Sequence, residues 1–159
     1  MLQDLNTIFS GAIAADGTRT AQAITATAIS TNVLDERQPA GSPALKDVGV
    51  FGNHDLWLVV QVIQAFNNLT SLTITLESDS APGMATAPVV HFSKTIALAA
   101  LTAGANAVRV QIPSDQYKRY IGVRYTVTGT APTTGSVMAF ITMDAQNNNL
   151  YPGSFTVDV

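Results

Sequence analysis

The stretch YKRYIGVRYTVTG, residues 117–129, decides the fold class because its side chains alternate with a period of two. Successive side chains of a β-strand point to opposite faces, so this pattern predicts a strand with one buried and one solvated face. Aromatic and β-branched residues favour that state, and the turn residues 113–115 and Gly129 mark its ends. The predicted buried face comprises Ile121, Val123, Tyr125 and Val127.

Similar alternation or β-branched composition predicts further strands along the chain. They span residues 21–34, 46–51, 56–66, 70–77, 89–96, 108–112, 137–143 and 155–159. The stretches 56–66 and 137–143 are apolar on both sides, which is typical of a central strand whose two faces are both covered. Residues 56–66 and 70–77 are predicted to form a hairpin, and residues 97–107 to form one helical turn and a loop.

These eight or nine short strands, with turn signals about every 8–12 residues, predict an all-β fold. The most consistent architecture is a jelly-roll-like two-sheet antiparallel β-sandwich with an N-terminal arm. Residues 1–20 are predicted to be the arm and residues 21–159 a single sandwich domain.

The composition is 47% hydrophobic and 12% charged, whereas an average domain is about 25% charged. A surface poor in charge suits extensive contact with other proteins, although a sparsely charged monomer is the alternative. The net charge of -3 argues against nucleic-acid binding. No signal peptide or membrane-spanning run is apparent, and the absence of cysteine excludes disulfides and thiolate sites.

No residue pattern predicts a catalytic, cofactor-binding or metal site. His54-Asp55 and His91 do not form a convergent ligand set, and we interpret them as a capped turn and a histidine on the solvated side of its strand. A Ser-His-Asp arrangement remains open on residue types, but there is no Gly-x-Ser-x-Gly elbow. The spacing of Glu77 and Asp79 matches no calcium loop. We therefore expect a non-enzymatic protein without cofactors.

Lys118, Arg119 and Arg124 form the basic cluster of the chain. Lys118 and Arg124 are predicted to share one side of the strand, while Arg119 leans to the other side. The cluster either protects a sheet edge or meets an acidic neighbour, and both interpretations remain open.

At the level of whole segments, the chain resembles the cement, or decoration, protein family of short-tailed phages, whose type member stabilises a Bordetella phage capsid. The similarity covers most of the chain from about residue 21 onward and lies in strand and turn patterns rather than catalytic motifs. The segments that carry it are AQAITATAISTNVLD (21–35), LWLVVQV (56–62), LTITLESD (72–79), IALAALTAG (96–104) and RYIGVRYTVTG (119–129).

The resemblance implies a jelly-roll subunit, made in the host cytoplasm, that binds the major capsid protein on the outer surface of the virion. It also implies a homo-oligomer, either a dimer or a trimer. From the net charge and the lack of a long apolar run, we expect no nucleic-acid or membrane partner. We expect capsid contacts from the arm and the basic cluster, namely Leu2, Leu5, Ile8, Phe9, Lys118, Arg119 and Arg124. The alternative is a carbohydrate- or receptor-binding sandwich, but Trp57, the one tryptophan available for a sugar platform, is predicted to be buried.

Overall fold

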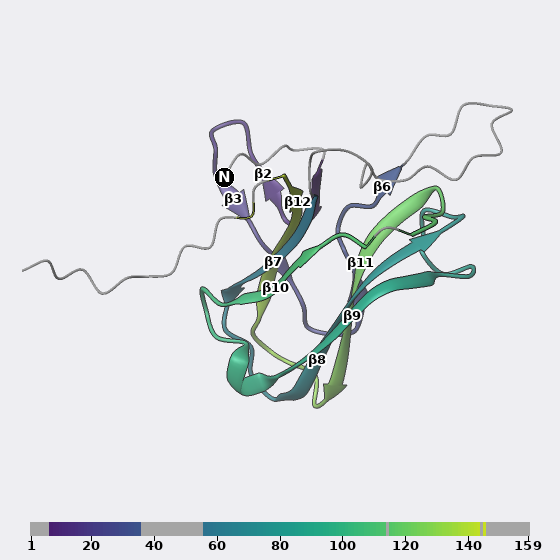
Figure 1. Cartoon of the computed structure of the whole chain (residues 1–159). Helices are drawn as coiled ribbons and strands as arrows, with labels where there is room; N and C mark the ends of the chain where they lie inside the picture. Colours follow the sequence, from purple (N-terminus) through teal and green to yellow (C-terminus); the bar gives the residue numbers. More distant parts are fainter. Residues whose placement is uncertain (1–6, 36–55, 114, 144, 146–159) are drawn as a thin grey trace, which may run out of the picture.

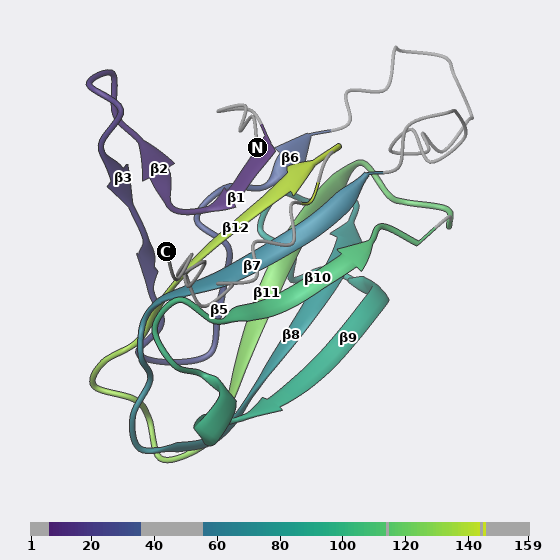
Figure 2. The same ribbon diagram turned by 60° about the vertical axis from the view of Figure 1, so that its left-hand side comes forward.

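The computed structural model describes residues 7–35, 56–113, 115–143 and 145. Two antiparallel sheets pack face to face (Figures 1 and 2), which confirms the predicted all-β sandwich. The β12 sheet contains β1 (Ile8–Ser10), β4 (Gln22–Ala23), β12 (Ser136–Thr142), β7 (Trp57–Gln64) and β10 (Asn106–Gln111). The β11 sheet contains β5 (Ala28–Ile29), β6 (Leu34–Asp35), β11 (Tyr120–Gly129), β8 (Leu69–Asp79) and β9 (Val89–Ala97).

The order of the strands is that of a jelly roll. The β12 sheet runs β1-β12-β7-β10 with β4 also paired to β12, and the β11 sheet runs β5-β11-β8-β9 with β6 also paired to β11. From β6 to β12, consecutive strands therefore alternate between the sheets except at the β8–β9 hairpin, as the double Greek key of a jelly roll requires. The 3-10 turn η2 (Leu98–Ala100) follows β9, which confirms the helical turn predicted in this region.

The main core lies between the two sheets. On β11, the predicted inner residues Ile121, Val123 and Tyr125 are 1%, 1% and 0% exposed, which confirms the alternation of the opening stretch. Inner residues of β7 and β12, such as Val60 and Ala139, belong to the same buried cluster. Tyr117 is also buried, but it precedes β11 instead of lying within it.

A second apolar cluster involves the remaining apolar side chains of β7 and β12. Val59, Met138 and Phe140 are 4%, 3% and 0% exposed, and Trp57 and Ile13 pack against them. The outer face of the β12 sheet is therefore covered as well, which explains why both strands are apolar on both sides. This confirms the prediction that β7 and β12 are central strands.

The predicted hairpin of residues 56–66 and 70–77 is wrong. β7 pairs with β10 and β12, whereas β8 pairs with β9 and β11, so the intervening turn carries the chain from one sheet to the other. The Asn67 side chain holds this crossing, because its Oδ1 accepts the amides of Thr133 and Thr134 at 2.9 and 3.0 Å. Asn68 has a φ of 63°, a backbone conformation that asparagine tolerates. The turn was recognisable, but the partner of each strand depends on distant residues.

The single strand predicted for residues 21–34 is also wrong. The structure divides the stretch into β4, which pairs with β12, and β5 and β6, which pair with β11. Gln22 fastens the bend, since its side chain donates to the Ile29 carbonyl and accepts the Thr31 amide. Alternation of small residues specifies a strand period, but it does not specify a single sheet.

The described part of the predicted arm has two portions. β1 is a strand of the sandwich, whereas β2 (Ala12–Ile13) and β3 (Arg19–Thr20) form a separate two-stranded hairpin that projects from the body (Figure 2). Gly11, at the junction, has a φ of 98°, and a Cβ there would lie 2.5 Å from the Thr20 carbonyl oxygen. The strands predicted at 46–51 and 155–159, together with Leu2, Leu5, His54 and Asp55, lie outside the described residues.

Candidate functional site

The end of β8 concentrates buried polar side chains. Glu77, Ser78 and Asp79 are 5%, 0% and 0% exposed, although each carries a polar or ionisable group. Burying such groups is unfavourable unless partners replace their water. Each of the three anchors a different polar network at this end of the sandwich.

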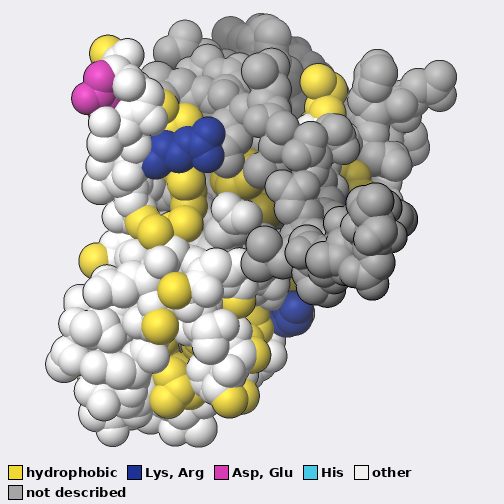
Figure 3. All heavy atoms as spheres, turned by 90° about the vertical axis from the view of Figure 1, so that its left-hand side faces the viewer, with side chains coloured by type: hydrophobic (Ala, Val, Ile, Leu, Met, Phe, Trp, Pro, Cys, Tyr) yellow, Lys and Arg dark blue, Asp and Glu magenta, His cyan; other side chains and the backbone are white. Residues whose placement is uncertain are grey.

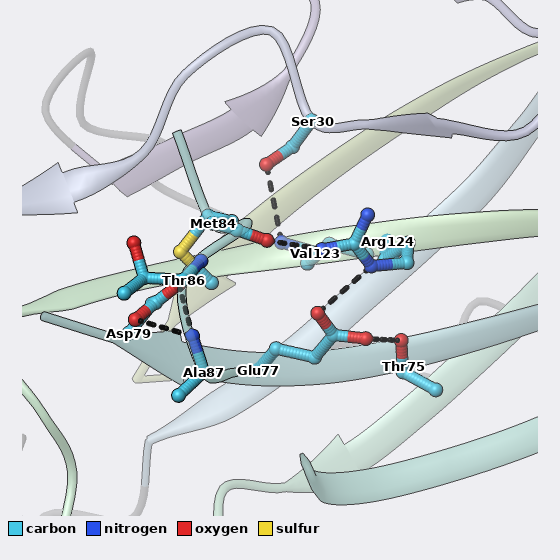
Figure 4. A network of polar contacts seen from close by, with 9 residues as sticks. All are labelled: Ser30, Thr75, Glu77, Asp79, Met84, Thr86, Ala87, Val123 and Arg124. Atoms are coloured by element: carbon cyan, nitrogen blue, oxygen red, sulfur yellow. Dashed lines mark hydrogen bonds and ion pairs between the residues drawn. The ribbon is translucent and has the colours of Figure 1, made fainter. Parts of the chain in front are cut away.

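Glu77 forms an ion pair with Arg124 of the neighbouring strand (Figure 4). Arg124 Nε donates to Glu77 Oε2 at 2.9 Å, and the Thr75 hydroxyl donates to Glu77 Oε1 at 2.7 Å. Arg124 Nη2 also donates to the Met84 carbonyl at 2.5 Å, which ties the loop between β8 and β9 to β11. Both carboxylate oxygens are therefore engaged by protein donors.

Asp79 folds the same loop from its other side. Its Oδ1 accepts the Ser80 amide at 2.6 Å. Its Oδ2 accepts the Thr86 amide at 2.9 Å, with longer contacts from both oxygens to the Ala87 amide (Figure 4). Burial acts to raise the pKa of the Asp79 carboxyl, but the Thr86, Ser80 and Ala87 hydrogen bonds together lower it below 3.8. These contacts favour the charged form and give Asp79 a structural role.

Ser78, His91 and Asp115 form a hydrogen-bonded chain. Ser78 Oγ lies 2.7 Å from His91 Nε2, and His91 Nδ1 lies 2.7 Å from Asp115 Oδ2. The His91 side chain is 0% exposed, and its ring lies against that of Tyr117 with centroids 3.9 Å apart. The interpretation of His91 as a residue of the solvated side was therefore wrong.

A β-bulge explains why His91 turns inward. Leu76 pairs with Phe92, but the next residue, Glu77, pairs with Val90, so His91 is the additional residue on β9. An additional residue interrupts the alternation of side chains. His91 consequently meets the inward-facing Ser78, while Val90 becomes 52% exposed.

These three side chains follow the order of a serine-hydrolase triad, but the serine is not accessible to a substrate. The Ser78 hydroxyl accepts the Lys118 amide at 3.0 Å, which favours donation of its own proton to His91 Nε2 and of the Nδ1 proton to Asp115. The nucleophile of a triad must nevertheless meet its substrate, and Ser78 is 0% exposed. The Ser78–His91–Asp115 network instead joins the segment between β10 and β11 to strands β8 and β9.

Asp115 is the exposed end of this chain, with a side chain that is 51% exposed. The hydrogen bond from His91, assisted by the Gln116 amide, lowers the pKa of the Asp115 carboxyl below 3.8. Within the described residues, no group of three or more His, Asp or Glu side chains is placed to hold a metal ion.

The three residues of the basic cluster have separate partners. The Lys118 ammonium donates to the Ala87 carbonyl and Arg124 donates to the Met84 carbonyl, so both reach the β8–β9 loop. Arg119 instead forms a two-pronged ion pair with Asp35 of β6, at 2.8 and 3.0 Å. Lys118 and Arg119 precede β11, so the predicted division of the cluster between two faces of one strand is not tested, and the predicted capsid contacts stay a prediction.

A cavity of about 430 Å³ lies beside β1, β6 and β12. Its lining includes Ile8 and Phe9, which are only 4% and 2% exposed because β1 packs into the sandwich. The Asn32 side chain crosses this region and donates to the Ile8 carbonyl at 3.1 Å. Whether Ile8 and Phe9 contact a capsid stays a prediction.

Comparison with known proteins gives one family. The model of the Bbp16 family matches residues 18–141, a range that contains every strand from β3 to β11 and nearly all of β12. The name of the family points to a Bordetella phage protein, which is consistent with a structural role in a phage. No curated protein matches the chain.

None of the described elements is a helix with the length and hydropathy of a membrane span.

Proposed function

The chain belongs to the Bbp16 family, and on that premise we propose that it is a non-enzymatic cement protein of a phage virion. In this role, the subunit binds the outer surface of the assembled shell, bridges neighbouring major capsid protein subunits and resists internal pressure. The family match over residues 18–141 is the observation that carries the proposal.

The chemistry of the described surface supports a contact role. The whole chain is only 12% charged, and charged side chains are sparse over the described part of the face in Figure 3. Interface cores are depleted of charged residues. Covering such a surface with another protein therefore costs little free energy for removing charged groups from water. Each contact need only be modest because many copies act together on a shell.

The polar networks support a structural rather than a catalytic role. Ser78 is enclosed, and the Glu77 and Asp79 carboxylates are occupied by protein donors. A sugar-binding sandwich has less support, because Trp57 is half-buried and the Arg109 guanidinium lies 5.4 Å from its ring centroid. That ring is not a free stacking platform.

Co-sedimentation with capsids that lack the protein tests the proposal. We expect saturable attachment to assembled shells and no attachment to unassembled major capsid protein. A protein that stays at the top of the gradient at every concentration would contradict the proposal.

The predicted contribution of the arm requires a truncation that spares β1. Removing residues 1–20 would also remove Ile8 and Phe9 from the core, whereas removing residues 2–6 leaves every described residue in place. We expect the shorter truncation to weaken attachment. Unchanged occupancy on shells would eliminate the residues before β1 as contacts.

A further inference from the structure

We propose that the outer face of the β11 sheet is the surface that docks on the shell protein. Hydroxyl side chains of β8, β9 and β11 dominate this face, which we call the hydroxyl face. This inference rests on the proposed function and specifies which surface makes the contact. The hydroxyl face consists of Ser71, Thr73, Ser93, Thr95, Thr126 and Thr128.

The strand register places these side chains in rows across the sheet. Thr73 lies opposite Thr126 on one side and Thr95 on the other, and Ser71 lies opposite Thr128. Directly opposed residues point to the same face of a sheet. The Thr73 and Thr95 hydroxyls are hydrogen-bonded at 2.8 Å, which links β8 and β9 within this row.

The intervening residues establish that this face points outward. Leu72, Ile74 and Leu76 are each 0% exposed and belong to the core between the sheets. Their neighbours on β8 therefore project to the opposite side. On the edge strand β9, Ser93 and Thr95 are exposed, as is Thr128 at the end of β11.

The hydroxyl face presents little net charge. The adjacent Glu77 and Arg124 neutralise each other in a 2.9 Å ion pair. Lys94 of β9 lies opposite the core residue Ile74 and donates its Nζ proton to the Ala107 carbonyl at 2.9 Å. The cation of the edge strand is therefore directed toward the β12 sheet instead of the hydroxyl face.

These features define the partner by its chemistry. Hydroxyl groups both donate and accept hydrogen bonds, and threonine adds a methyl group, so the face suits an uncharged patch of amide, hydroxyl and small apolar groups. A charged partner group would lose its water here without gaining a counter-charge, which is unfavourable. The occupant is accordingly an uncharged outer patch of the shell protein.

Docking through the hydroxyl face and docking through the basic cluster predict different effects of salt concentration on attachment to the shell. A contact made by Lys118 and Arg119 with acidic groups weakens as ionic strength rises, because exposed charges are screened. A contact made by uncharged hydroxyls is expected to change less than about twofold between about 50 mM and about 500 mM salt.

The test is co-sedimentation of the full chain and two lysine variants with capsids that lack the protein. Thr95→Lys places a charge within the hydroxyl face, and Thr102→Lys places the same charge at an exposed position in the loop before β10. We expect Thr95→Lys to weaken attachment about tenfold or more and Thr102→Lys to leave it unchanged. If Thr95→Lys does not fold by circular dichroism, Thr128→Lys replaces it at the end of β11.

The outcomes separate the inference from the proposed function. If the unaltered protein fails to attach, both fall. If it attaches, and Thr95→Lys attaches equally well, the docking face is overturned while the cement function stands. A change in oligomeric state by size-exclusion chromatography with unchanged attachment would also overturn the inference, since the face would then join copies of this chain.

Discussion

Arg124 Nε lies 2.9 Å from Glu77 Oε2, and the Glu77 side chain is only 6% exposed. We expect Arg124→Ala to lower the free energy of unfolding by about 3 kcal/mol, because a buried carboxylate would lose its counter-charge. Urea denaturation followed by tryptophan fluorescence provides the measurement.

Arg119 provides the matched control for Arg124. Its ion pair with Asp35 has similar distances, but its side chain is 49% exposed and solvent screens the pair, so Arg119→Ala should lower the free energy of unfolding far less than Arg124→Ala does. Equal losses in the two variants would show that burial does not distinguish these ion pairs.

Replacing Asp115 with asparagine should make the free energy of unfolding depend less on pH in the acid range. The His91 hydrogen bond lowers the pKa of this carboxyl in the folded chain below its ordinary value of 3.8. The unfolded chain therefore binds a proton first, so the contribution is complete above about pH 4 and is lost as the pH falls through the folded pKa. We expect the stability difference between the unaltered protein and Asp115→Asn to be largest near neutral pH and to shrink in acid. Parallel pH profiles of unfolding would contradict this account.

Tyr125 and Ser10 are expected to be energetically coupled. Burial raises the pKa of the Tyr125 phenol, although the hydrogen bond with Ser10 Oγ, at 2.6 Å, opposes that shift. Tyr125→Phe should cost about 1–2 kcal/mol, because it leaves the fully buried Ser10 hydroxyl without this partner. In the Ser10→Ala background, the same change should cost less. Additive losses in this double-mutant cycle would exclude the coupling.

A serine-directed fluorophosphonate probe should leave the folded protein unlabelled. The Ser78–His91–Asp115 chain has the order of donors found in hydrolases, but Ser78 is 0% exposed. Mass spectrometry of the treated protein is the measurement, with a known serine esterase as the positive control. Stoichiometric labelling that disappears in Ser78→Ala would instead identify an active site.

The strands that carry regular patterns were predictable from sequence. Ile121, Val123 and Tyr125 face the core as their alternation predicted, and the doubly apolar β7 and β12 are both central. In these segments, the burial of each side chain follows from its own strand period.

The pairing of strands was less predictable, because it depends on distant contacts. Asn67 was recognisable as a turn residue, but its bonds to Thr133 and Thr134 are what stabilise the crossing between sheets. Likewise, nothing local to residues 21–34 indicates that β4 pairs with β12 while β5 pairs with β11.

The polar networks were missed for a related reason. One additional residue in β9 turns His91 inward, and a period-two pattern contains no signal for such a bulge. The one available sequence signal was the run Glu77-Ser78-Asp79, three polar residues at the end of an otherwise apolar-alternating strand. It indicated a polar site, but it could not identify Asp115 as a partner.

Heating shells with and without the bound protein tests the cement proposal most directly. Capsids that lack the protein would be saturated with it, freed of excess and followed by light scattering and release of packaged DNA as the temperature rises. We predict that occupied shells disrupt at a higher temperature than bare shells, and that the shift grows with occupancy. Saturable attachment with an unchanged disruption temperature would show that the protein decorates the shell without cementing it.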